Sequence, residues 1–442
     1  MSFRLDWEKL LSDRRHGQAA SSATGAGGRN RFEQDYDRVI FSAPFRRLAG
    51  KTQVHPFASL DHVHNRLTHT LEVASVGRSL AQAAFQLLVE RGEVPPGRGA
   101  EDIGYIVQSA CLAHDIGNPP FGHAGEFAIR AWAQEHLDDI FPYRDAGASL
   151  RATLDDWRWF EGNAQSFRLV SRADNRDQDY FLFTYASLGA LIKYPWAVDD
   201  PRTAEKKKHG AFSSEKPLLA EVCADLGLHG PDGMVRHPLS YLSEAADDIC
   251  YRIADFEDAV EMRILPESEV RDIFKLIIGD TPDVASRPLP ALRARAIRRL
   301  IEAAVAAFRD DYEAIMAGRR PSDRDLKSDF PSHVQAALKL IKLRYEPIFD
   351  HRPKVAVELG AHAVLGRILS TYARAVRELA EKRSYEQLGF VHKRCLVLAW
   401  PETYIRANES RDTAWWLARV MDHVAGMTDA HATQVSREIT GA

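Results

Sequence analysis

The helical spacing of apolar residues is the feature that most constrains the fold of this 442-residue chain. From Arg66 to Glu90, apolar residues recur at steps of three and four, which is the period of an amphipathic helix. Residues 103–114 and Leu239 to Ile264 carry two further stripes of this kind. The stripe of the first segment comprises Val73, Val76, Leu80 and Ala84. Because no segment shows a convincing strand pattern, the sequence predicts an all-α fold.

Ionisable residues fall on or beside these stripes. His69 lies four residues before Val73, and His114 ends the second stripe just before a break at Gly117. Asp247, Tyr251 and Asp255 share a stripe that adjoins the apolar face of the third segment. A single core histidine can be satisfied by a backbone carbonyl, but several buried ionisable groups each need a partner. We therefore expect these side chains to meet.

The composition describes a globular cytoplasmic chain. Hydrophobic residues make up 45% and charged residues 27%, and the formal net charge is −4. The four cysteines lack CxxC spacing, which argues against a zinc ribbon or a disulfide framework. The first fifteen residues carry charges throughout, unlike a signal peptide, and no later apolar run is long enough to span a bilayer.

Two histidines and two aspartates suggest a metal site. His69, His114, Asp115 and Asp247 would supply four ligands from three helices, and two carboxylates balance the charge of a divalent cation. Next along the chain, Glu126 follows His123 by three residues, so the two share a helix face. The carboxylate can then fix the tautomer of the imidazole. The alternative is a surface histidine capped by a nearby glutamate.

Six ordered segments resemble the HD-domain deoxynucleoside triphosphate triphosphohydrolases, the dGTPase-like family. They are RLTHT (66–70), AHDIGNPPFGHAGE (113–126), FEGNAQ (160–165), TYASLGALIKYP (184–195), SEAADDICYRIADFEDA (243–259) and HVAGMTDAHA (423–432). The resemblance implies an HD-domain helical bundle core with additional C-terminal helices. We expect an N-terminal helix and flexible loop over 1–30, the HD catalytic domain over 31–265, and a C-terminal helical region packed on the core over 266–442.

The same resemblance assigns site residues. The metal ligands would be His69, His114, Asp115 and Asp247, the last chosen over Asp248 because it reproduces the family's Asp, Tyr, Asp spacing. They would hold one divalent ion, Mg²⁺ or Mn²⁺, although other divalent ions fit too. Asn118 stands where many other HD hydrolases have a further histidine, which argues against a dinuclear site.

His123 would be the catalytic histidine with Glu126 as its partner, and whether it acts as base or acid stays open. Substrate contacts also follow from the resemblance. Arg66, Lys193 and Tyr194 would reach the phosphates, while Gln53, Tyr251 and Asp255 would contact the sugar. The alternatives are solvated helix-end cations and, for Tyr251, ordinary core packing. We favour a solvated loop for Lys206–Lys208 over phosphate steering, and helix capping for Asn163 and Gln165 over shaping the pocket.

The implied reaction is metal-dependent hydrolysis of a dNTP to a deoxynucleoside and inorganic triphosphate, with base preference open. Two alternatives are an HD phosphomonoesterase or phosphodiesterase acting on nucleotides, and a nucleotide- or single-stranded-DNA-binding sensor. We expect a homo-oligomer, with a regulatory nucleotide or single-stranded DNA as further partners and no membrane association. The basic run at 293–299 is the candidate nucleic-acid face, although such a stripe is more often a solvated helix side.

Overall fold

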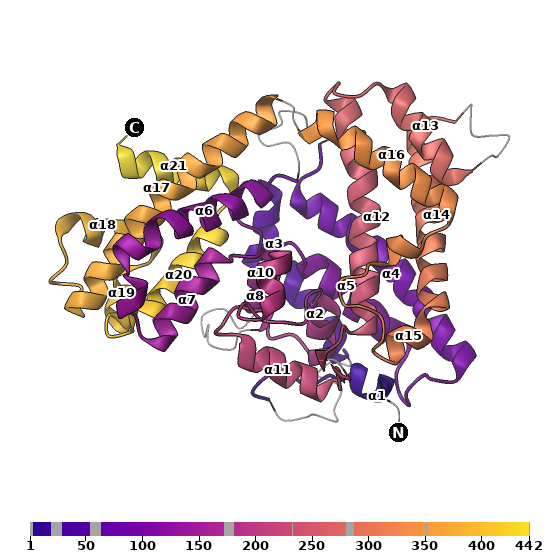
Figure 1. Cartoon of the computed structure of the whole chain (residues 1–442), viewed down its shortest axis with the longest axis horizontal. Helices are drawn as coiled ribbons and strands as arrows, with labels where there is room; N and C mark the ends of the chain where they lie inside the picture. The colour runs from indigo at the N-terminus through magenta and orange to yellow at the C-terminus, as the bar shows by residue number, and fades with distance from the viewer. Residues whose placement is uncertain are drawn as a thin grey trace.

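The computed structural model confirms the all-α fold (Figure 1). It describes residues 3–18, 29–53, 63–171, 181–231, 233–279, 287–349 and 352–441. Within these ranges the strands form one small antiparallel pair, β1 (His229–Gly230) and β2 (Gly233–Met234), which the sequence did not predict. No helix in the described ranges combines the length and apolar character needed to cross a bilayer.

Three helices that pack against one another build the frame of the site: α4 (Arg66–Arg91), α5 (Ala100–Ala113) and α12 (Pro238–Glu261). All three were predicted from their apolar spacing. Helix α4 begins with a capping box, in which Asn65 and Thr68 bond each other's backbone N–H groups. It ends at Gly92, whose φ of 65° suits a residue without a side chain. Local capping therefore fixes where α4 starts and stops.

The remaining helices surround this frame. They are α1 (Trp7–Leu10), α2 (Arg31–Ile40), α3 (Ala43–Arg47), α6 (Gly122–Ile140), α7 (Ala148–Arg158), α8 (Gly162–Ser171), α9 (Tyr185–Leu191), α10 (Pro201–Lys206), α11 (Lys216–Asp225), α13 (Glu267–Ile278), α14 (Leu289–Asp310), α15 (Tyr312–Met316), α16 (Ser332–Phe349), α17 (Arg352–Lys382), α18 (Phe390–Ala399), α19 (Glu402–Asn408), α20 (Thr413–Ala425) and α21 (Asp429–Thr440). Short 3₁₀ turns lie at Leu48–Gly50, Tyr143–Asp145 and Leu326–Asp329.

Helix α9 corrects one prediction. The sequence pattern suggested a helix over 177–195, but the helix spans only Tyr185–Leu191. Thr184 is extended and caps α9 by accepting the Ser187 N–H, while its own N–H is donated to the Asp35 carboxylate. That long-range contact holds the preceding backbone out of the helix. Residues 177–180 of the predicted helix and 19–28 of the predicted flexible loop lie outside the described residues.

Two apolar cores flank the site. The first surrounds α4, α5 and α12 and extends to α13 and α14, and the second joins α6 and α7 to α17, α20 and α21. Figure 1 shows α17 running along α6 on one side of the molecule and α12, α13, α14 and α16 grouped on the other. Both cores combine residues from before and after position 265. The domain limits stay predictions. Trp416 is fully buried in the second core, whereas Trp415 is partly exposed.

Candidate active site

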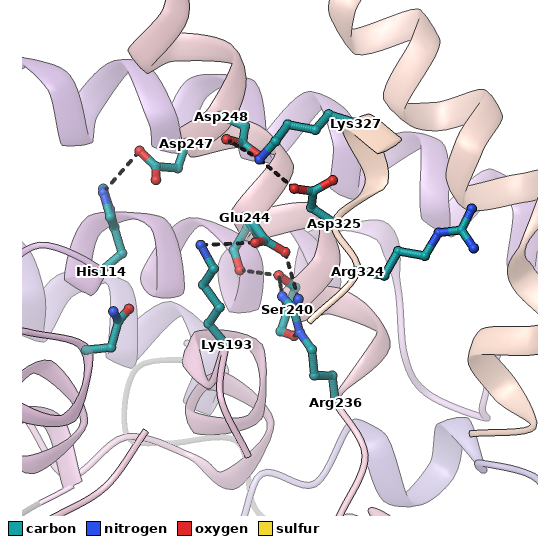
Figure 2. A network of polar contacts seen from close by, with 12 residues as sticks. His114, Lys193, Arg236, Ser240, Glu244, Asp247, Asp248, Arg324, Asp325 and Lys327 are labelled. Carbon is teal, nitrogen blue, oxygen red and sulfur yellow. Dashed lines mark hydrogen bonds and ion pairs between the residues drawn. The ribbon is translucent and has the colours of Figure 1, made fainter. Parts of the chain in front are cut away.

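Four side chains converge where α4, α5 and α12 meet. Ligand atoms of His69, His114 and Asp115 lie within 4.8 Å of one another. Asp247 Oδ1 lies 3.0 Å from His69 Nε2 and 3.5 Å from His114 Nε2. In Figure 2 the His114 ring points toward Asp247. Imidazole nitrogens and carboxylate oxygens at this spacing fit the donor set of a divalent metal ion.

Hydrogen bonds and neighbouring charges set the tautomer of His114 and the ionisation of His114 and Asp247. His114 donates its Nδ1–H to the Cys111 carbonyl at 2.6 Å, which leaves Nε2 facing the cluster. Burial alone would lower the pKa of His114, but the charges of Asp115 and Asp247 raise it to about 9. Burial would raise the pKa of Asp247, yet the two histidines hold it well below its ordinary value. The carboxylate is therefore ionised and ready to bind a cation.

Asp248, the competing ligand, faces other partners. Its carboxylate accepts hydrogen bonds from Lys327 Nζ at 2.8 and 3.0 Å and from Arg252 Nη1 at 2.7 Å. Figure 2 shows Lys327 between Asp248 and Asp325, on the other side of α12 from His114. The geometry therefore favours Asp247 over Asp248.

His123 and Glu126 meet at the start of α6, as the sequence predicted. His123 Nδ1 lies 3.0 Å from Glu126 Oε2, and the His123 side chain is 75% exposed while Glu126 is buried. The second Glu126 oxygen accepts the backbone N–H of Gly162 at 2.8 Å. Burial alone would raise the pKa of Glu126, but the hydrogen bond to His123 and the charge of Lys208 lower it to about 2. An ionised, anchored carboxylate can orient the imidazole.

The cluster of His69, His114, Asp115 and Asp247 and the pair His123–Glu126 line one large cavity of about 1000 Å³. Its lining comes from the frame helices, from the first turns of α6 and the first half of α17, and from the segments 52–53, 161–163, 191–194 and 207–208. The cavity's cationic lining residues are Arg66, Arg130, Lys193, Lys207, Lys208 and Lys354. A chamber of this size with many cations suits a polyanionic ligand of nucleotide dimensions.

Comparison with known proteins identifies the family. A family model described as the HD domain matches residues 66–159. A "Deoxyguanosinetriphosphate triphosphohydrolase-like protein" of Pseudomonas aeruginosa (strain LESB58) is 41% identical over 99% of both chains. A protein of the same name from Synechocystis sp. (strain ATCC 27184 / PCC 6803 / Kazusa) is 34% identical over 99% of both chains. The "Deoxyguanosinetriphosphate triphosphohydrolase" of Cronobacter sakazakii (strain ATCC BAA-894) is 30% identical over 92% of this chain and 93% of its own.

The chain belongs to the deoxyguanosinetriphosphate triphosphohydrolase-like family of HD-domain proteins.

The phosphate-binding residues predicted for this triphosphohydrolase-like chain line the cavity but already have partners. Arg66 donates to Asp115 Oδ2 at 2.6 Å. Burial would lower the pKa of Lys193, but Glu244, whose Oε1 lies 3.0 Å from Nζ, raises it (Figure 2). Tyr194 stacks at a tilt on Trp196, with ring centroids 5.3 Å apart. Lys193 therefore stays charged.

The predicted sugar contacts divide into two groups. Gln53 and Tyr251 line the cavity, and the buried Gln53 Oε1 has no hydrogen-bond partner among the described residues. Asp255 does not line the cavity and is fully buried. Burial of Tyr251, together with the charge of Asp255 and the hydrogen bond from the Tyr251 hydroxyl to it, raises the pKa of Tyr251. Asp255 thus lies behind Tyr251.

Two lysines of the cavity wall were not predicted as site residues. Lys208, predicted to be solvated, lies in the cavity wall, where its Nζ is 2.8 Å from Glu161 Oε2 and 3.9 Å from Glu126 Oε2. Lys354 reaches the cavity from α17. The basic run at 206–208 was the sequence feature that pointed to Lys208, and no such feature marked Lys354. The contacts of Lys208 could not be predicted because its partners are distant in the chain.

The capping prediction for the FEGNAQ segment needs correction. Glu161 accepts the Asn163 backbone N–H at 3.4 Å and its side-chain N–H at 2.6 Å, so Glu161 takes the capping position. Asn163 lines the cavity, and Gln165 is buried, donating to Asp422 at 3.0 Å. Asn163 therefore shapes the pocket, and Gln165 joins α8 to α20.

Proposed function

We propose that this chain hydrolyses deoxynucleoside triphosphates to a deoxynucleoside and inorganic triphosphate, with one divalent ion, Mg²⁺ or Mn²⁺, held by His69, His114, Asp115 and Asp247. The observation that carries the proposal is the convergence of these four groups beside a large cavity lined by six cations. Full-length relatives that bear the triphosphohydrolase name support the same chemistry.

The metal would supply a positive charge for an α-phosphate oxygen as negative charge builds up there. Release of intact triphosphate requires water to attack the α-phosphorus, so that the bond from phosphorus to the sugar 5′ oxygen breaks. The leaving oxygen needs a proton, and the attacking water loses one. His123 has Nδ1 engaged by Glu126, so Nε2 is the atom that exchanges one of these protons.

The remaining residues bind and orient the nucleotide. Arg66, Lys193 and Tyr194 would contact the phosphates from the cavity wall. Gln53 Oε1, which has no partner among the described residues, would accept a hydrogen bond from the 3′ hydroxyl. Tyr251 would pack against the sugar, and Asp255 would fix the Tyr251 hydroxyl from behind. A buried acceptor without a partner is costly, so a substrate hydroxyl there gains affinity.

No new observation bears on most of the predicted partners. Self-association and activation by a nucleotide or single-stranded DNA stay predictions. In the basic run, Arg293 pairs with Glu257, while Arg298 and Arg299 pair with Glu302. These ion pairs on and beside α14 favour a solvated helix side over a nucleic-acid face.

The test is product analysis with each dNTP and NTP, singly and in mixtures, with and without Mg²⁺ or Mn²⁺. Chromatography should find deoxynucleoside and triphosphate in equal amounts, and water labelled with ¹⁸O should label the triphosphate. Orthophosphate released from nucleoside monophosphates, or from cyclic nucleotides by way of a monophosphate, would favour the phosphoesterase alternative. Binding without turnover in every mixture would favour the sensor.

A further inference from the structure

The segment HVAGMTDAHA (423–432) has no role in the proposed chemistry, yet it makes buried polar contacts with the turn that presents His123. Asp429, the first residue of α21, is 3% exposed. Its Oδ1 accepts the backbone N–H of Phe121 at 2.8 Å. Its Oδ2 accepts the backbone N–H of Thr52 at 3.1 Å and the Thr52 hydroxyl at 2.7 Å. One carboxylate thus joins the C-terminal region to the active-site turn and to the segment 51–52.

The turn needs such support because its backbone is strained. Phe121 directly precedes α6 and has a φ of 64°, in the left-handed region that side chains other than glycine rarely adopt. The Phe121 side chain makes no capping hydrogen bond to α6. Since His123 is the second residue of that helix, a change at Phe121 rotates the first turn and moves the imidazole.

A second buried group binds the same turn to the same region. Lys51 is 2% exposed and donates from Nζ to the carbonyls of Asn118 and Ala425, the latter at 2.7 Å. Asn118 belongs to the HDIGN segment, and Ala425 is the last residue of α20. The Lys51 carbonyl also accepts the N–H of Arg66 at the start of α4. The segment 51–52 therefore lies between the metal-binding helices and the C-terminal region.

The partner carboxylate of His123 is tied to the same region by a third contact. Glu126 is held by the N–H of Gly162 at the start of α8. From α8, Gln165 and Arg168 both donate to Asp422 Oδ1 on α20, at 3.0 and 2.8 Å. Both members of the catalytic pair are thus connected to α20 and α21 through hydrogen bonds to the carboxylates of Asp422 and Asp429.

We infer that Asp429 is a positioning residue of the active site, which holds the left-handed turn at Phe121 and thereby sets the orientation of His123. The inference rests on the proposed function for its kinetic consequence. Its structural part, the restraint of residues 117–127 by Asp429, stands independently of any activity.

The test compares Asp429→Asn with Ser436→Ala. An asparagine keeps the size but cannot accept on both sides, so one of the donors at Phe121 or Thr52 loses its partner. Ser436 lies on the same helix and is 2% exposed, and its hydroxyl accepts from Arg367 on α17, at 3.0 Å, with no other side-chain partner among the contacts described. Both substitutions remove a buried hydrogen bond of α21, but only the first touches the turn.

We expect Asp429→Asn to lower kcat about 10-fold to 100-fold, as misplacement of a catalytic group by about 1 Å does, while KM and metal affinity change less than about threefold. Ser436→Ala should keep the parental kcat. In a His123→Ala background, Asp429→Asn should cause no further loss, because the two changes remove one function. Equal kcat losses in the two single variants, or additive losses in the double variant, would overturn the inference.

Hydrogen exchange provides the readout without activity. The peptide 117–127 should exchange faster in Asp429→Asn than in the parent and Ser436→Ala. Unchanged exchange there would overturn the positioning role. A parent that releases no triphosphate would end the proposed function alone, and the exchange result would then decide the structural inference by itself.

Discussion

At the scale of single residues, the orientation of His123 depends on a carboxylate held on two sides. Glu126 bonds the imidazole with one oxygen and the Gly162 N–H with the other, and Lys208 adds positive charge nearby. The hydrogen bond to His123 and the charge of Lys208 lower the pKa of Glu126 to about 2, so Glu126 is ionised at neutral pH. The imidazole is therefore kept in one tautomer while its other nitrogen faces solvent.

Replacing His123 by alanine should remove most of the rate and leave the metal site intact. We expect kcat to fall about 10²-fold to 10⁴-fold, the usual contribution of a positioned acid or base. KM should change little because the group acts chiefly in the transition state. Steady-state kinetics combined with metal titration checks this, and a variant with the parental rate would refute the assigned role.

Gly162 offers a second test of the same pair. A Cβ built on Gly162 would lie 2.1 Å from Asn118 Oδ1 and 2.8 Å from Glu126 Oε1, closer than atoms can approach. Gly162→Ala should therefore displace Glu126 and lower kcat by about 10-fold or more. Gly147→Ala is the control, since Gly147 lies just before α7, also at a helix start, but its Cβ would meet nothing within 4 Å. Equal activities of the two variants would show that Glu126 does not depend on this contact.

The residue types suggested a four-ligand set, and the spacing shared with the family selected Asp247 over Asp248. Their contacts separate them, because Asp248 pairs with Lys327 and Arg252. The role of Lys208 was not predictable, since its partner Glu161 lies 47 positions away. Residue patterns thus indicate which ionisable groups face inward. Contacts between residues that are distant in sequence can be found only from the folded structure.

At the scale of elements, a partly buried ion pair joins the segment just before α4 to the end of α12. His64 Nδ1 lies 2.7 Å from Asp258 Oδ1, and His64 Nε2 lies 3.5 Å from Glu72 Oε1. Hydrogen bonds to these two carboxylates raise the pKa of His64 to about 10. Since α4 and α12 each carry one of the proposed metal ligands, this contact helps to fix the distance between His69 and Asp247.

The His64 contact should make stability depend on pH. Because the folded-state pKa lies above the ordinary 6.5, the stabilisation is complete below pH 6.5 and is lost as pH rises through about 10. We expect His64→Gln to lower the free energy of unfolding by about 1.5–3 kcal/mol at pH 6, the range for hydrogen bonds to charged groups. Urea unfolding of parent and variant at pH 6, 8 and 10 measures this. A difference that stays constant with pH would contradict it.

Element prediction succeeded where local signals agree with tertiary contacts. The apolar period and the flanking breaks indicated α4, α5 and α12. The prediction was wrong for 181–184, because the Asp35 carboxylate captures the N–H of Thr184 and α9 starts late. No local pattern records a contact between positions 35 and 184.

At the scale of the whole molecule, the cavity lies where two apolar cores meet. Its metal-binding side belongs to α4, α5 and α12, and another part of its lining is formed by α6 and α17. The contribution of α17 could not be predicted, because its residues reach the cavity only through packing against α6. A ligand that contacts both the α4, α5 and α12 part and the α6 and α17 part of the lining should stabilise both apolar cores against unfolding.

The most direct test of the account is the number of divalent ions bound per chain in the parent, Asp247→Asn and Asp248→Asn. Metal analysis after dialysis against Mn²⁺ should find one ion in the parent and in Asp248→Asn, and none in Asp247→Asn. Mn²⁺ at about 100 times its Kd should then stabilise the first two by about 2.7 kcal/mol against unfolding. Retention of the ion by Asp247→Asn with its loss from Asp248→Asn, or two ions in the parent, would contradict the four-ligand site.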